Sequence, residues 1–588
     1  MDLRERKGCF VRRLLCFLKK YRKESVLGPL FKMLEALFEL FIPLVVADIV
    51  DVGIANKDTS YIVQRCLLMV ALGVIGLLCS ITAQYFSAKA AVGMATGMRH
   101  ALFAKIGRLS YAETDRFGTS TLLSRTTADV NQIQTAVNMV LRLFLRSPFI
   151  VFGAMIMAFT VSPSAALTFV VTIPALSVVV FGVMLISIPL FRRVQEKLDR
   201  VLGLTRENLT GTRVVRAFVR EEESAAEFVA TNSELTRLQR FTGRFSALLN
   251  PVTYVIINLS ILVIVWRGGV QVNLGHLQTG EVIALYNYMS QILIELIKLA
   301  NFIILIMKAC ACATRVNAVL DAPDGMPQGD VTEAPAPTAR GRVEFRNVTF
   351  AYHEGAAPAI EQISFVAEPG ETVGVIGGTG SGKSSLVSLI PRFYDVTEGT
   401  VLVHGRDVRD YANPEDLRAT VGVVPQKAEL FAGTVRDNLR WGKEDADDEA
   451  LFAALETAVA ADFVREKEGG LDFEIEQGGR NLSGGQKQRL TIARALVRRP
   501  DILILDDSAS ALDYATDKRL REGLSALDYH PTVFIVSQRT ASLLRADRIL
   551  VLENGEAVGL GTHEELLDTC PVYREIHMSQ FGNEEVAK

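Results

Sequence analysis

The stretches GGTGSGKS, at residues 377–384, and ILILDDSASALD, at residues 502–513, decide the fold of the second half of this 588-residue chain. In the first stretch, four residues separate the opening glycine from a Gly-Lys-Ser triplet, which is the spacing of a P-loop. An apolar run at residues 372–376 precedes it and predicts a strand. A run at residues 385–390 follows it and predicts a helix. Strand, glycine-rich loop and helix in this order are the context that a P-loop needs.

A loop of this kind binds phosphate because its backbone N–H groups lie at a helix N-terminus, where no side chain obstructs the anion. We therefore expect Lys383 to reach the outer phosphates of a nucleotide and Ser384 to offer its hydroxyl to Mg²⁺. The second stretch predicts a buried strand that ends at Asp506, which is placed to hold the same magnesium. The predicted nucleotide contacts of the loop are Gly377, Gly378, Thr379, Gly380, Ser381, Gly382, Lys383, Ser384 and Ser385.

A third motif, NLSGGQ at residues 481–486, lies upstream of that strand. With this signature, the second half of the chain resembles the nucleotide-binding domain of an ABC ATPase, which implies ATP and Mg²⁺ as cofactors. The resemblance implies that Tyr352 stacks on adenine, that Gln426 occupies the Q-loop and contacts magnesium, and that residues 510–513 form a D-loop ending at Asp513. The signature residues implied to contact the ATP of a partner chain are Leu482, Ser483, Gly484, Gly485 and Gln486.

Two positions depart from the ABC pattern. The magnesium strand normally ends Asp-Glu and here ends Asp506-Asp507, and the switch that usually reads His-Arg here reads Gln538-Arg539. The shorter side chain of Asp507 leaves its carboxylate roughly an ångström or more short of the glutamate position. A misplacement of that size can cost on the order of a hundredfold in rate. Gln538 cannot be protonated. Each change alone is compatible with a working site, whereas the two together predict a weakly hydrolytic one.

ABC domains pair head to tail, so each ATP lies between the P-loop of one chain and the signature of the other. A homodimer of this chain would therefore contain two impaired sites. The combination of an impaired P-loop site with a complete signature resembles the degenerate-site subunit of heterodimeric bacterial multidrug ABC exporters. That resemblance implies a partner subunit with an intact glutamate and an intact switch histidine.

The first half of the chain is apolar. The whole sequence is 49% hydrophobic, with a mean hydropathy of +0.25. Six apolar runs are judged against the roughly twenty residues that cross a bilayer; they lie at about 26–48, 66–86, 139–161, 165–190, 248–266 and 282–307. We therefore predict an all-α six-helix transmembrane domain at residues 1–320, a Pro-, Gly- and Ala-rich linker at 321–341, and an α/β P-loop ABC nucleotide-binding domain at 342–588. Within the last of these, residues 458–464 have the apolar spacing of a helix.

Lysine and arginine are frequent at residues 87–138 and 191–247 and scarce at 49–65, 162–164 and 267–280. Because basic loops stay on the cytoplasmic side, both termini and the nucleotide-binding domain are expected in the cytoplasm of a protein of the inner (plasma) membrane. The two basic segments are long enough for helices that continue below the membrane. Residues 4–23 predict an amphipathic helix on the cytoplasmic membrane face.

Two short irregular pieces interrupt the basic segments, DRFGTSTLLSR at 115–125 and ENLTGTRVVRAFVRE at 207–221. Both resemble the intracellular loops of type IV ABC exporters. The resemblance implies that each carries a transverse coupling helix that presses on a nucleotide-binding domain.

The membrane half also holds the ionisable residues Glu35, Glu39, Glu295 and Lys298. Such residues usually face a cavity or pair with one another. Glu35 and Glu39 are one helical turn apart and share a face, so they could attract a cationic substrate. The alternative is that these residues lie near the membrane surfaces, or that Glu295 and Lys298 simply pair, and the sequence leaves both interpretations open.

These features predict ATP-driven export of amphipathic small molecules through a lipid bilayer. The alternatives are an ATP-gated or regulatory ABC membrane protein that does not pump, and an exporter of lipid or peptide. A net charge of −3 gives no reason to expect nucleic acid as a partner, and the seven cysteines lack the CxxC spacing of a metal site. A soluble ABC ATPase is excluded by the six predicted spans.

Overall fold

The computed structural model describes residues 16–326, 328–331, 339–353 and 355–581, without the side chains at 300, 301 and 581. The chain divides into two compact units. The first comprises Met1–Gly107 and Phe117–Ala322, and the second comprises Arg108–Arg116 and Pro323–Lys588. The sequence-based division placed residues 108–116 with the membrane part, whereas here they cluster with the soluble unit. Most of the amphipathic helix predicted at 4–23 lies outside the described residues.

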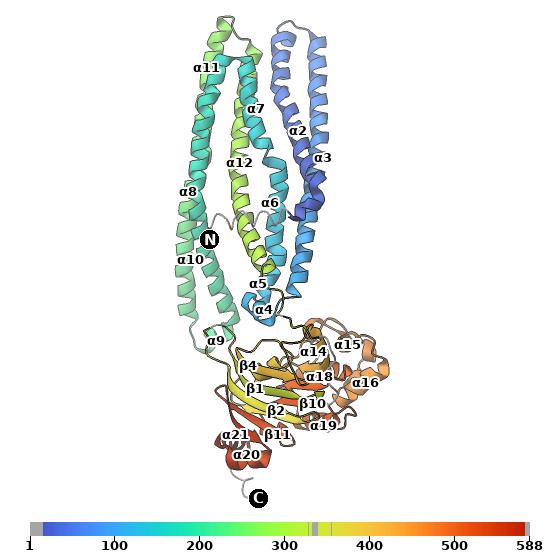
Figure 1. The fold of residues 1–588 in the computed structure, drawn as a ribbon. Helices are drawn as coiled ribbons and strands as arrows, with labels where there is room; N and C mark the ends of the chain where they lie inside the picture. The colour runs from blue at the N-terminus through green and yellow to red at the C-terminus, as the bar shows by residue number, and fades with distance from the viewer. Residues whose placement is uncertain (1–15, 327, 332–338, 354, 582–588) are drawn as a thin grey trace. The chain divides into compact units, whose positions relative to one another are not determined.

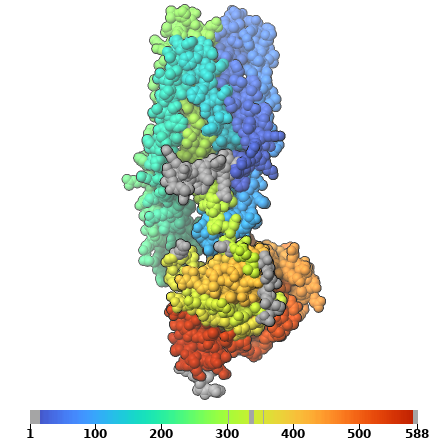
Figure 2. All heavy atoms as spheres, in the orientation of Figure 1, coloured from blue at the N-terminus to red at the C-terminus, as the bar shows by residue number. Residues whose placement is uncertain are grey.

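The first unit consists of long helices that pack side by side (Figures 1 and 2). They are α2 (Arg22–Asp48), α3 (Thr59–Ile106), α6 (Val130–Leu143), α7 (Arg146–Val161), α8 (Pro163–Thr210), α10 (Glu221–Ala247), α11 (Leu249–Asn273) and α12 (Thr279–Leu320). Short helices α5 (Thr119–Ser124) and α9 (Thr212–Ala217) lie in the two irregular pieces. This arrangement is the helical transmembrane domain that the apolar runs predict.

Four helical stretches of the described chain are long and apolar enough to cross a membrane: Thr59–Ile106, Thr119–Val161, Pro163–Thr210 and Glu221–Asn273. The two other predicted spans lie in α2 and α12, which carry the ionisable residues of the sequence analysis. The count of six membrane crossings therefore stays a prediction.

The third predicted span, at 139–161, is interrupted. Helix α6 ends at Leu143, and α7 begins at Arg146 after a two-residue turn. The next connection is as short as predicted, because α7 ends at Val161 and α8 begins at Pro163. The hydroxyl of Ser162 accepts a hydrogen bond from the Ala165 N–H at 3.4 Å and so caps α8.

The second unit is built on two main sheets, and the larger has the strand order β12-β11-β3-β10-β9-β6. Its strands are β3 (Thr372–Gly377), β6 (Val421–Val424), β9 (Ile502–Asp506), β10 (Thr532–Val536), β11 (Arg548–Glu553) and β12 (Glu556–Gly561). All pair in parallel except β12. Alternate residues of β9 enter two different apolar clusters, so both faces of the strand are buried. Burial on both faces explains why its sequence is a continuous apolar run.

The smaller sheet has the order β2-β1-β4-β5, and a further pair joins β7 to β8. The strands are β1 (Val343–Phe350), β2 (Ile360–Ala367), β4 (Glu398–Val403), β5 (Arg406–Asp407), β7 (Gly433–Thr434) and β8 (Glu474–Ile475). The helices of this unit are α13 (Lys383–Leu389), α14 (Pro414–Thr420), α15 (Val435–Arg440), α16 (Asp448–Thr457), α17 (Ala461–Glu466), α18 (Gly484–Val497), α19 (Tyr514–Ser525), α20 (His563–Thr569) and α21 (Pro571–Phe581).

The helix predicted over residues 458–464 is confirmed only from Ala461 onward, and residues 458–460 are not helical. Helix α16 ends at Thr457, Val459 adopts the left-handed conformation at φ 56°, and α17 begins only at Ala461. The Val459 N–H donates to the Glu456 carbonyl at 3.0 Å, and the Ala460 N–H donates to the Leu455 carbonyl at 2.7 Å. These two bonds form a Schellman motif, which ends the helix although the apolar spacing continues through it.

Residues 108–116 enter the second unit through aromatic and polar contacts. The Tyr111 ring stacks on Phe393 with 4.3 Å between centroids, and the Tyr394 hydroxyl donates to the Asp115 carboxylate at 2.7 Å. Both residues lie on the short helix α4 (Tyr111–Phe117). The start of the first irregular piece is therefore attached to the soluble unit.

Candidate nucleotide site

Four neighbouring parallel strands present the predicted site residues at one edge of the larger sheet. The P-loop follows β3, Gln538 follows β10, Asp506 ends β9, and Gln426 follows β6. Because the carboxyl ends of parallel strands meet at the same edge, motifs far apart in the sequence come together there.

The P-loop glycines are required for two different reasons. A Cβ at Gly377 would lie 2.1 Å from the Leu552 carbonyl oxygen, and one at Gly382 would lie 2.5 Å from that of Ala359. Gly382 also has φ 95°, which suits glycine. A Cβ at Gly378 or Gly380 would meet no atom within 4 Å. The loop is therefore packed on one side and open on the other, which fits a phosphate on the open side.

Lys383 is buried at the start of α13, and its ammonium group donates to the Gly377 carbonyl at 2.9 Å and to the Gly378 carbonyl at 2.6 Å. Burial lowers the pKa of Lys383, although the carboxylates of Asp507 and Asp506 oppose that effect. The cation is thus held inside the loop by backbone carbonyls, in position for phosphate oxygens.

The hydroxyl of Ser384 donates to the Asp506 carboxylate at 3.0 Å. Burial raises the pKa of Asp506, and this hydrogen bond acts against the rise. A hydroxyl and a carboxylate in contact are hard oxygen ligands of the type that Mg²⁺ prefers, so these two residues fit a magnesium site. When bound, the ion supplies positive charge to the phosphate oxygens.

Asp507 and Gln426 are in contact, since the Gln426 amide donates to the Asp507 carboxylate at 3.2 Å. The Asp507 backbone adopts φ 44°, and its N–H donates to the Val536 carbonyl of β10 at 3.0 Å. Its carbonyl accepts from the Ser510 hydroxyl at 2.8 Å. The backbone of Asp507 is therefore fixed by its neighbours, so a longer reach could come only from a longer side chain.

The Gln538 side chain is exposed and makes no hydrogen bond within the described part of the chain. Its backbone carbonyl accepts a hydrogen bond from the Gln580 amide at 2.6 Å. The sequence analysis missed Gln580, because it lies 42 positions further along the chain on α21.

Tyr352 lies beside the P-loop helix. Its hydroxyl is 2.8 Å from that of Ser385, and its ring packs edge-on against Phe350 and Tyr394. The residue is 44% exposed, which leaves room for stacking on an adenine. Asp513 has a different local role, because it caps α19 by accepting from the Thr516 N–H at 2.8 Å. That hydrogen bond lowers the pKa of Asp513.

The signature begins α18. The Ser483 hydroxyl accepts from the Gln486 N–H at 3.3 Å, and the Gln486 side chain accepts from the Ser483 N–H at 3.0 Å, which forms a capping box. Leu482 is buried, whereas Ser483 and Gly484 are exposed. A Cβ at Gly485 would lie 3.1 Å from the Ala511 carbonyl. The exposed start of a helix is suited to a phosphate supplied from outside this chain.

The four ionisable residues considered in the sequence, Glu35, Glu39, Glu295 and Lys298, are all paired within the described chain. The Lys32 ammonium contacts Glu35 at 2.6 Å. Arg146 contacts Glu39 at 2.7 Å and Glu295 at 2.5 Å.

Glu295 also accepts from Ser147 at 2.7 Å and from Lys298 at 2.8 Å. Glu295 and Lys298 therefore pair with each other, as one of the alternatives from the sequence predicted. Lys32 and Arg146 were missed, although each is an ionisable residue inside a predicted span.

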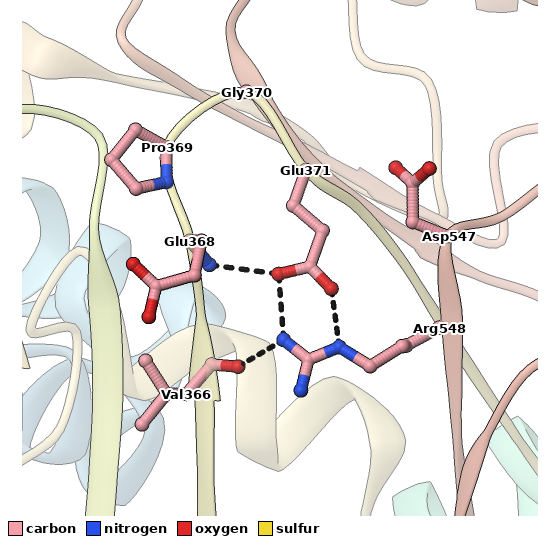
Figure 3. Close-up of a pocket in the computed structure, with 7 residues that line it drawn as sticks. All are labelled: Val366, Glu368, Pro369, Gly370, Glu371, Asp547 and Arg548. Atoms are coloured by element: carbon pink, nitrogen blue, oxygen red, sulfur yellow. Dashed lines mark hydrogen bonds and ion pairs between the residues drawn. The ribbon is translucent and has the colours of Figure 1, made fainter.

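A hollow on the surface of the second unit lies apart from these motifs (Figure 3). There the Arg548 guanidinium donates to the Val366 carbonyl at 2.6 Å and pairs with Glu371, which also accepts from the Glu368 N–H at 2.8 Å. Burial raises the pKa of Glu371, but its hydrogen bonds to Arg548 and the backbone bring the pKa below its usual value. The ion pair joins the start of β11 to the start of β3, the strand that leads into the P-loop.

A P-loop site at the edge of a parallel sheet, a signature helix and a helical transmembrane domain together define an ATP-binding membrane transporter. Two family models match the chain: "ABC transporter transmembrane region" at residues 25–296 and "ABC transporter" at residues 360–510. The chain belongs to the ABC transporters, and its soluble unit is an ATP-hydrolysing ABC domain.

Similar proteins span nearly the whole chain. An uncharacterised ABC transporter ATP-binding protein of Mycobacterium tuberculosis is 40% identical, over 96% of this chain and 97% of its own. The ATP-dependent lipid A-core flippase of Hahella chejuensis is 32% identical, over 96% and 98%. A bacterial Atm1-family ABC exporter with ATP bound has the same fold, with a TM-score of 0.79 and 24% identity over 95% of this chain and 99% of its own.

Proposed function

We propose that this chain is the degenerate-site subunit of a heterodimeric ABC exporter that moves amphipathic small molecules across the inner (plasma) membrane. Both termini and the ATP-binding domain lie in the cytoplasm. The partner is a second ABC half-transporter with an intact glutamate and switch histidine. The observation that carries the proposal is the pair of changes at Asp507 and Gln538 beside a complete signature.

In this chain's own site, binding is separated from hydrolysis. The open P-loop and Lys383 would hold the phosphates, and Ser384, Asp506 and Gln426 would hold a magnesium ion. Asp507 is the group that should orient the attacking water, but its backbone is fixed by β10 and its carboxylate accepts from Gln426. ATP therefore stays bound in this site and is hydrolysed slowly.

The partner's site is completed by this chain's signature. The Ser483 hydroxyl and the N–H groups of Gly484 and Gly485 lie at the exposed start of α18. They bind the outer phosphate of the partner's ATP when the two domains close, and they stabilise the charge that develops there.

Lipid is a second candidate cargo. The lipid A-core flippase similarity covers almost the full length of both chains. A lipid, like an amphipathic drug, carries a polar and an apolar part, so the same kind of path suits both. Transport assays with labelled lipid and with drug panels distinguish the two cargoes.

Reversion of the two altered residues tests the impaired site without the partner. The purified full-length chain alone should hydrolyse ATP slowly, and Asp507→Glu with Gln538→His should raise kcat at least about tenfold, because the water-orienting group regains its reach. The reverted chain that also carries Lys383→Ala gives the background rate. Vigorous turnover by the unmodified chain, with no gain on reversion, contradicts the proposal.

A further inference from the structure

Helix α21 is hydrogen-bonded to the switch segment, residues 537–540. The Gln580 amide nitrogen donates to the Gln538 carbonyl at 2.6 Å. Its amide oxygen accepts from the Thr540 N–H at 2.9 Å and from the Thr540 hydroxyl at 3.1 Å. One side chain therefore bonds to the main chain on both sides of Arg539, as a neighbouring strand would.

His577, one helical turn earlier on α21, supports the same contact. Its Nδ1 lies 3.1 Å from the Thr540 hydroxyl, and both residues are buried. The His577 ring packs edge-on against His563, with 5.1 Å between centroids. The His563 ring in turn is 2.7 Å from the Tyr573 hydroxyl. Helix α21 is thus packed against α20 next to the residues through which it contacts the switch segment.

The switch segment is also constrained within itself. The Ser537 hydroxyl accepts from the Arg539 N–H at 2.9 Å. Held by this bond and by Gln580, the main chain at 537–540 has a defined course, and the side chain of residue 538 points outward from it. Strands β9 and β3, which carry Asp506 and the P-loop, flank β10 on its two sides.

We infer that Gln580, supported by His577, is a positioning residue for the switch, so that α21 sets where residue 538 lies relative to the nucleotide. The inference rests on the proposed function only in taking the site to act on ATP. A displacement of about an ångström at a reacting centre can cost on the order of a hundredfold in rate. Loss of the Gln580 bonds should therefore slow turnover more than it weakens binding.

The first test is Gln580→Ala in the reverted, full-length chain with Asp507→Glu and Gln538→His. We expect kcat to fall at least about tenfold while KM for ATP changes less than about twofold. Gln580→Glu keeps the acceptor for Thr540 and loses the donor to residue 538, so it should be intermediate. Ser579→Ala is the matched control, because Ser579 is exposed and, within the described chain, hydrogen-bonds only to Ile576 of its own helix. Equal kcat in Gln580→Ala and Ser579→Ala overturns the inference.

The second test does not depend on turnover. Amide hydrogen exchange of residues 537–542 is compared in the unmodified chain, Gln580→Ala and Ser579→Ala, each with and without ATP and Mg²⁺. We expect faster exchange at Thr540 in Gln580→Ala alone, and loss of the additional protection that ATP gives. If the reverted chain does not hydrolyse ATP, the proposed function fails but this measurement still decides the inference. Identical exchange in all three chains then overturns it.

Discussion

At the residue scale, the residues that fit phosphate and magnesium are distinct from Asp507 and Gln538, the two positions that depart from the ABC pattern. Lys383 is held by two loop carbonyls, and Ser384 contacts Asp506 at 3.0 Å, so binding groups are already in place. Asp507 instead accepts from Gln426, and its backbone is tied to β10. Under the proposal, ATP occupancy and ATP hydrolysis therefore depend on different residues.

Lys383→Ala should weaken ATP binding at this chain's own site roughly tenfold to a hundredfold, because a hydrogen bond to a charged group contributes about 1.5–3 kcal/mol. The measurement is retention of labelled ATP by the assembled complex. Lys443→Ala is the control, since Lys443 is an exposed lysine whose ammonium lies 4.0 Å from Asp445. If Lys383→Ala retains as much ATP as the control, the assignment of Lys383 to phosphate binding is wrong.

At the element scale, three helices of the transmembrane domain are joined by buried charge. Arg146 at the start of α7 bridges Glu39 on α2 and Glu295 on α12. Because each acid has a cationic partner, this pairing favours a structural role for Glu35 and Glu39. Attraction of a cationic substrate by these two residues stays a prediction.

Glu295→Gln should destabilise the transmembrane domain, because it leaves the buried Arg146 with one partner, the half-exposed Glu39. Breaking a buried pair typically costs about 3–5 kcal/mol. Thermal unfolding of the purified chain measures the loss. Lys298→Gln is the control, since Lys298 is half-exposed and its replacement leaves the Arg146–Glu295 contact intact. Equal stability of the two variants would show that the network does not hold the helices together.

Sequence pattern predicted the elements around the nucleotide site well, because their signals are local. The strand before the P-loop, the helix after it and the strand ending at Asp506 appear as β3, α13 and β9, with bounds that differ by at most two residues. The helix break at Val459 was missed, since apolar spacing continues through a turn closed by backbone bonds. The Gln580 contact had no local signal at all. Arg146 did have one, because it is a charge inside an apolar run.

At the scale of the whole molecule, the proposal places this chain's two phosphate-binding surfaces in different ATP sites. Under the proposal, the P-loop binds ATP in a slow site of this chain. The exposed start of α18 completes the partner's site, where hydrolysis is proposed to take place. In a symmetric ATPase, a change at Asp507 should lower ATPase activity more than a change at Ser483. In this chain we expect the reverse.

The most direct test is steady-state ATPase activity of the co-purified complex of this chain with its partner subunit, with either Ser483→Arg or Asp507→Asn in this chain. Ser483→Arg places a bulky cation where the partner's outer phosphate docks, and loss of such a clamp costs on the order of a thousandfold. Asp507→Asn alters this chain's own site, which is proposed to contribute little to ATP turnover, so the change should have a small effect. The account predicts that Ser483→Arg is nearly inactive while Asp507→Asn keeps a substantial fraction of the unmodified rate. Loss of turnover in Asp507→Asn with activity retained in Ser483→Arg would contradict it, because this chain's own site would then be the catalytic one.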